Sequence, residues 1–293
     1  MKLKGNSKAG LKLTAVFSAA AFGLLFIIRL YHTFALTDGA TGFFTVHNFT
    51  VPVMYALLGI GVIGAVALCY ICKDLPSGEV KSKTSVLYVA ASFFFALTLI
   101  YDGYKNVRKV ISYGGGLSAA KEALDGNIGV ISTVFAFLGA LSIILSVIVY
   151  LRDGRKMNIL SIPMLFPVIW AFLETLSFFS ITVSYVKVSQ LLFSIFYCAF
   201  LMVFLFENAR VLTGVGRRDS LWFFYATGII TAGLTLASGV PSMLSDIFTP
   251  GNVVTYCPFE LYALSGGIYA LASMLIRAKE IDGNDNTDLT ERE

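Results

Sequence analysis

Eight long apolar stretches run along this chain, and almost all of its lysines and arginines lie in the gaps between them. A helix needs about 20 mostly apolar residues to cross a bilayer, because the hydrocarbon core is about 30 Å thick and each residue rises about 1.5 Å. The predicted spans are 13–36, 50–72, 84–102, 129–151, 159–182, 185–206, 220–240 and 258–277. The sequence therefore predicts an all-α membrane protein, a polytopic bundle of about eight transmembrane helices.

The composition supports this fold class. Of the 293 residues, 57% are hydrophobic and 14% are charged, and the mean hydropathy is +0.78. A soluble domain usually carries about 25% charged residues, so this chain has too little polar surface for a water-soluble globule. The net charge of +4 is small, and its basic residues are spread over many loops. Nucleic acid is therefore not an expected partner.

The basic residues also predict the orientation of the bundle. Sixteen of the 22 Lys and Arg residues lie in the two terminal segments or in the loops after the second, fourth and sixth spans. Five lie on the opposite side, namely Lys105, Arg108, Lys109, Lys121 and Lys187. Cytoplasmic loops carry an excess of Lys and Arg. We therefore expect a multi-pass protein of the cell membrane with both termini cytoplasmic.

Residues 1–277 are expected to form a single transmembrane helical domain. Residues 278–293 form a polar tail with six acidic residues, and we expect this tail to be disordered and cytoplasmic. The longest external segment, 103–128, contains a short helical pattern from Ser118 to Asp125 that Gly126 should end.

Two spans have features that affect their length or shape. The third, 84–102, is the shortest and could extend past Tyr104. The fifth contains Pro163 and Pro167 near its cytoplasmic end. Each proline removes a backbone donor, so we expect that helix to bend.

Three ionisable side chains lie within or at the edge of the predicted spans. Arg29 is the seventeenth residue of the first span and Glu174 is the sixteenth of the fifth, so both lie in the outer half of the membrane at similar depth. Lys187 enters with the sixth span from outside. Buried charges cost about 2.5–3.5 kcal/mol each on insertion scales, so they are expected to find partners.

Several interpretations of these charges remain open. Arg29, Glu174 and Lys187 could form an outward-facing ligand-binding site for an ion or a small molecule. Arg29 and Glu174 could instead form a structural ion pair that joins the first and fifth spans, or they could lie apart. Lys187 taken alone is more typical of a side chain that extends to the membrane surface.

The seventh span carries Thr227, Thr231 and Thr235 at intervals of four, on one helix face. A polar stripe of this kind suits the wall of a hydrated path, and these threonines are predicted ligand-binding residues. The alternative is that their hydroxyls bond to backbone carbonyls where helices pack.

Catalytic, cofactor and metal motifs are not evident in the sequence. It contains no Walker A loop, GxSxG elbow or HExxH pair, and the two histidines, His32 and His47, match no metal-ligand spacing. We expect no catalytic residues, no cofactor and no metal. A membrane enzyme would need an acid or base such as Glu174, Asp246 or Glu260.

Two functional hypotheses follow. The first is a small-solute transporter or a substrate-binding membrane component with an outward-facing polar site. The second is a non-transporting membrane sensor or accessory subunit, acting through helix contacts with a partner membrane or cytoplasmic protein. Both place the chain in contact with the lipid bilayer.

Overall fold

The computed structural model describes residues 6–36, 49–71, 85–124, 126–152, 159–180, 188–214, 221–248 and 261–290. Within these ranges the chain is almost entirely helical and has no strand. Seven of the described helices are long and apolar enough to cross a membrane, and another apolar helix, Pro163–Phe179, is shorter. The predicted all-α polytopic membrane fold is therefore confirmed.

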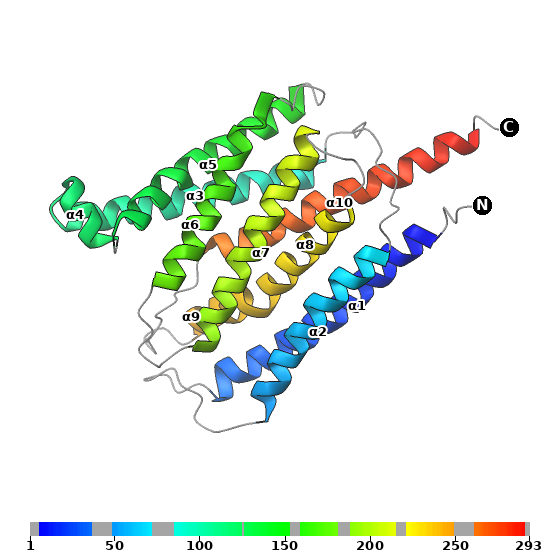
Figure 1. Cartoon of the computed structure of the whole chain (residues 1–293), viewed down its shortest axis with the longest axis horizontal. Helices are drawn as coiled ribbons and strands as arrows, with labels where there is room; N and C mark the ends of the chain where they lie inside the picture. The colour runs from blue at the N-terminus through cyan, green and yellow to red at the C-terminus, as the bar shows by residue number, and fades with distance from the viewer. Residues whose placement is uncertain are drawn as a thin grey trace.

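Each predicted span corresponds to a helical element, and two of them contain a stretch of π-helix. The elements are α1 Asn6–Tyr31 with η1 His32–Leu36, α2 Thr50–Ile71, α3 Val86–Ser112, α4 Gly116–Ala123, α5 Asn127–Arg152, η3 Pro163–Leu165 with α6 Phe166–Ser180, α7 Val188–Thr213, α8 Leu221–Leu234 with η5 Thr235–Gly239 and α9 Val240–Phe248, and α10 Leu261–Thr290. Successive spans run in opposite directions. The start of α1 and the end of α10 consequently lie at the same end of the bundle (Figure 1). We call the opposite end the far end.

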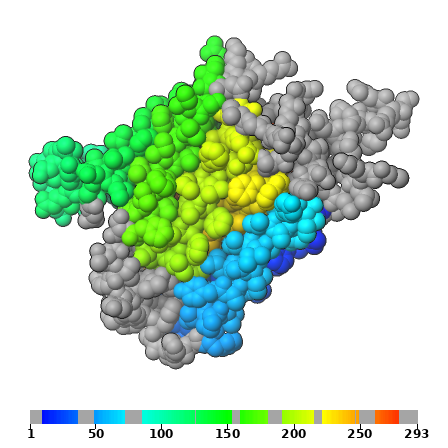
Figure 2. Space-filling model, in the orientation of Figure 1, coloured from blue at the N-terminus to red at the C-terminus, as the bar shows by residue number. Residues whose placement is uncertain are grey.

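The helices form two groups joined by a central layer. On one side α1 packs against α2, and both contact α8. On the other side α5 packs against α3 and α6. Helices α7, α8 and α10 lie between these groups, since α7 contacts α6 and α8 while α10 contacts α3 and α8. The space-filling view shows the same order, with α7 between the α1–α2 pair and the α5–α6 pair (Figure 2).

Aromatic side chains fill the centre of the bundle around α10. The Tyr269 ring stacks on Phe95 of α3, with centroids 5.4 Å apart, and meets Phe204 of α7 edge to face at 6.2 Å. Tyr262 contacts Trp170 of α6 at 4.9 Å. Each aromatic pair adds about 0.5–1.5 kcal/mol beyond the burial of its area. These contacts join α3, α6, α7 and α10.

Glycines allow the close approach of α1 to its neighbours. The buried Phe22 ring of α1 lies against Gly61 of α2, 3.4 Å from where a Cβ would be, and it lies still closer to Gly233 of α8. Lipid tails are as apolar as these helices, so association depends on packing, and small residues permit it. Phe22 therefore fixes α1 between α2 and α8.

Several predicted spans differ from the structure in their bounds; α7, for example, continues to Thr213, past the predicted end at 206. Helix α3 continues to Ser112, ten residues past the predicted end at 102. The fifth span is shorter than predicted, and its prolines do not interrupt the helix. Pro163 is the first residue of η3 and Pro167 is the second of α6, where a proline fits because its missing N–H would have no helical acceptor.

The segments outside the predicted spans are also helical where the structure describes them. The short external helix is present as α4, which begins and ends two residues earlier than predicted. Gly126 follows it with φ of 112°, a conformation that favours glycine. The backbone of α10 continues as helix to Thr290, into the stretch for which the sequence predicts a disordered tail.

Candidate functional site

Arg29 is a buried cation in the last turn of α1. Its side chain is 4% exposed, and its guanidinium carbon lies 4.7 Å from the centroid of the Phe193 ring of α7. Among the described residues, no hydrogen bond or ion pair joins this side chain to another group, and its Nε has no acceptor. A desolvated cation–π contact contributes about 2 kcal/mol, whereas burying an ion costs several kcal/mol. The described surroundings therefore leave the charge of Arg29 largely uncompensated.

A stretch of π-helix follows Arg29 directly, and a second one lies in a neighbouring helix. The first, η1, begins three residues after Arg29, and the second, η5, lies between α8 and α9. Helix α1 packs against η5, and η1 packs against α9. Pro241 accounts for η5 physically, because it cannot donate to the carbonyl four residues earlier and so interrupts the regular α-helical bonding. Short π segments occur frequently at functional sites.

A polar contact joins α2 to η1. His32 is fully buried, and its Nε2 lies 2.8 Å from Oγ1 of Thr50, at the start of α2. The Thr33 hydroxyl donates to the carbonyl of Arg29 over 2.8 Å. These two bonds restrain the backbone around Arg29, so they also restrict the position of its guanidinium.

Glu174 lies in the other helix group. The hydroxyl of Ser132 on α5 donates a 2.6 Å hydrogen bond to Oε1 of Glu174 on α6. In the same helix group, the buried carboxylate of Asp102 on α3 forms an ion pair with Lys105 at 3.4 Å. The far end of the α3–α5–α6 group therefore contains carboxylates that are hydrogen bonded or ion paired.

Arg29 and Glu174 do not form an ion pair with one another in the part of the chain that the structure describes. Arg29 contacts Phe193 of α7, and Glu174 accepts its bond from α5. Of the interpretations open from the sequence, this geometry agrees with the one in which Arg29 and Glu174 lie apart, each in contact with a different residue. Lys187, the third charge, lies outside the described residues.

The three threonines of the seventh span are buried. Thr227 and Thr231 donate to carbonyls of their own helix, over 2.9 Å to Phe223 and 2.8 Å to Thr227. Thr235 donates over 2.9 Å to the carbonyl of Ala263 on α10. These bonds agree with the alternative in which the threonine hydroxyls bond to backbone carbonyls where helices pack. A ligand-binding role for the three threonines stays a prediction.

Sequence reasoning identified Arg29 and Glu174 but missed their contacts. Phe193 is one of several phenylalanines in an apolar span, and nothing in its spacing distinguishes it. Ser132 carries no signal beyond being a small polar residue in a span. Pro241, which directly follows the predicted seventh span, is a local signal from which the deviation of this segment from α-helix could have been predicted.

Comparison with known proteins gives no relative for this chain. No family model, no curated protein and no solved structure matches it.

Proposed function

We propose that this integral membrane protein binds a small anionic solute at Arg29, near the far end of its bundle. It would act as a transporter for that solute or as the membrane-embedded binding component of a transport system. The observation that carries the proposal is the buried guanidinium, which has no acidic partner among the described residues. A bound carboxylate or similar anion would supply the missing negative charge and accept hydrogen bonds from the planar guanidinium fork.

The helix irregularities near Arg29 support the same proposal. Transporters commonly bind their substrate where helices are interrupted and irregular backbone lines the site. Here η1 follows Arg29, and η5 packs against the helix that carries it. The Phe193 ring covers one side of the guanidinium, which leaves its in-plane donors as the groups that would meet an anion.

The test uses purified protein and a panel of acetate, succinate and sulfate. We expect at least one of these anions to raise the unfolding temperature of the wild-type protein. The shift should be lost in Arg29→Gln and partly kept in Arg29→Lys. Arg152→Gln is the matched control, because it removes one positive charge from an exposed position of α5. An identical response of the wild type and Arg29→Gln to all three anions would contradict the proposal.

Uptake into proteoliposomes separates transport from binding. A transporter should accumulate the radiolabelled anion that shifts the unfolding temperature, and Arg29→Gln should not. Binding without uptake would favour the second hypothesis, a sensor or accessory subunit. Two observations favour that alternative. The hydroxyls of Thr231 and Thr235 are bonded to backbone carbonyls, and aromatic side chains such as Phe95 and Tyr269 fill the centre of the bundle.

A further inference from the structure

The last turns of α3 form a basic surface that the proposed solute site does not use. Helix α3 has 27 residues, which corresponds to about 40 Å, so it exceeds the hydrocarbon core by about 10 Å. Its apolar part is the predicted span 84–102. The turns that carry Lys105, Arg108 and Lys109 therefore lie beyond the apolar part, at the level of the lipid headgroups.

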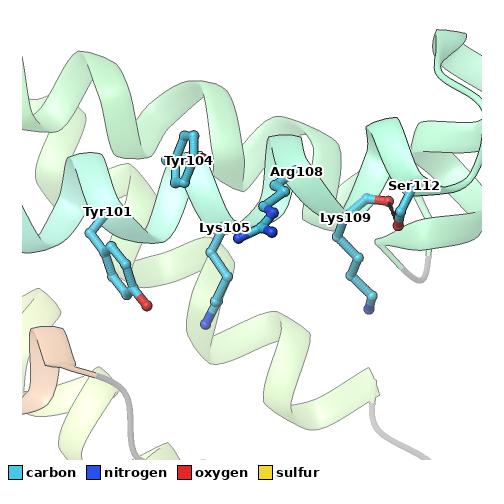
Figure 3. Close-up of a pocket in the computed structure, with 6 residues that line it drawn as sticks. All are labelled: Tyr101, Tyr104, Lys105, Arg108, Lys109 and Ser112. Carbon is cyan, nitrogen blue, oxygen red and sulfur yellow. Dashed lines mark hydrogen bonds between the residues drawn. The ribbon is translucent and has the colours of Figure 1, made fainter.

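A shallow, open cavity of about 300 Å³ lies along these turns and is lined by aromatic, basic and hydroxyl side chains. The lining residues are Tyr101, Tyr104, Lys105, Arg108, Lys109 and Ser112. Figure 3 shows Tyr101, Lys105 and Lys109 extending from the same side of α3, as their spacing of four residues requires. Tyr101 and Tyr104 are each more than half exposed.

The charges at this surface are not balanced by the acidic groups described around it. Asp102 pairs with Lys105 at 3.4 Å. Arg108 and Lys109 are exposed and form no ion pair with a described residue. An excess of positive charge therefore remains at the end of the bundle where the positive-inside rule predicts few basic residues.

We propose that the cavity formed by Tyr101, Tyr104, Lys105, Arg108 and Lys109 binds a phosphate group at the membrane interface. Arg and Lys donate charge-assisted hydrogen bonds to phosphate oxygens. Tyrosines are enriched at this depth because the ring meets apolar chains while the hydroxyl meets polar groups. The phosphate could belong to an anionic phospholipid headgroup or to a soluble phosphate, and the two sources share this chemistry.

The experiment compares the wild type with two triple variants of the full-length protein, each purified in detergent to which no lipid is added. The test variant is Lys105→Gln with Arg108→Gln and Lys109→Gln. The control is Lys12→Gln with Lys121→Gln and Arg152→Gln, which removes three positive charges from other exposed positions. Native mass spectrometry counts retained phosphatidylglycerol against phosphatidylcholine. Equilibrium dialysis with radiolabelled inorganic phosphate measures the soluble ligand.

We expect the wild type and the control to retain phosphatidylglycerol, and the test variant to bind it about tenfold more weakly or worse. If excess inorganic phosphate leaves the lipid bound, the headgroup is the source. If inorganic phosphate itself binds the wild type and not the test variant, the source is soluble phosphate. Equal binding of both probes by the wild type and the test variant would overturn the proposal. Because every variant keeps Arg29, this failure is separate from a failure of the solute site.

Discussion

The guanidinium carbon of Arg29 lies 4.7 Å from the centroid of the Phe193 ring, and this contact connects α1 to α7. An aromatic face stabilises a cation without neutralising it. Phe193 therefore supplies no negative charge to balance Arg29. The predictions below separate this arrangement from an ordinary structural ion pair.

Arg29→Met should leave the free energy of unfolding unchanged or raise it by about 1–3 kcal/mol, because an apolar side chain of similar length removes a costly buried charge. Arg210→Met is the matched control. Arg210 pairs with the buried Glu207 at 3.0 Å, so this substitution should destabilise the protein by leaving a buried carboxylate without its partner. Reversible unfolding in detergent measures both changes. Equal losses for the two variants would show that the charge of Arg29 has a partner.

Exchanging the charges of Arg29 and Glu174 should not restore the protein. Arg29→Glu places a carboxylate against the Phe193 ring, whose face is negative, and should lower the yield of folded monomer. Adding Glu174→Arg should not restore it, because this change removes the carboxylate that accepts the 2.6 Å bond from Ser132 and forms no ion pair with position 29. Size-exclusion profiles after detergent extraction report the yield. Recovery in the double variant would mean that the two residues pair.

Ser132→Ala should destabilise the protein by about 1 kcal/mol, since it removes the 2.6 Å bond between α5 and α6. The control is Ser142→Ala on the same helix, whose hydroxyl donates to the carbonyl of Leu138 within α5. Losing that local bond should change the free energy of unfolding by less than about 0.5 kcal/mol. If both variants unfold alike, the bond to Glu174 contributes no specific stability.

Gly139→Ala should destabilise the bundle by about 1–3 kcal/mol. A Cβ at this position of α5 would lie 3.1 Å from Cα of Pro167 on α6, and backbone atoms cannot move aside as a flexible side chain can. Gly59→Ala on α2 meets nothing within 4 Å, so it should be neutral or stabilising by up to about 1 kcal/mol. Thermal unfolding of the two variants tests the contrast. A neutral Gly139→Ala would mean that α5 and α6 can separate at no cost.

The loops after the first and second spans should be accessible from opposite sides of the membrane. Cysteines are introduced by Ala40→Cys and Val80→Cys in a protein without its native cysteines. An impermeant maleimide applied from outside should label position 40 and not position 80. Labelling of both positions in intact cells would exclude the predicted orientation with cytoplasmic termini.

Much of the fold could be predicted from local signals. Apolar length placed every described span, and Gly126 marked the end of α4 within two residues. The end of α3 was missed because its last turns are polar. A hydropathy pattern locates the apolar segment that can lie in a membrane, and it does not locate the residue at which the helix ends. The start of the fifth span, which contains α6, was placed too early for the opposite reason, since Pro163 and Pro167 lie in a continuous apolar run that extends beyond the helix.

The amino-acid sequence by itself determined the fold class, an all-α bundle of apolar helices, and the place of each apolar segment along the chain, because hydropathy and residue spacing act along one segment at a time. The tertiary structure alone decided which helices are neighbours. Phe22 fits between Gly61 and Gly233 and so fixes α1 beside α2 and α8, while α6 packs between α5 and α7. Arg29 consequently meets Phe193 and Glu174 meets Ser132, because the shapes of surfaces far apart in the sequence govern which side chains come into contact.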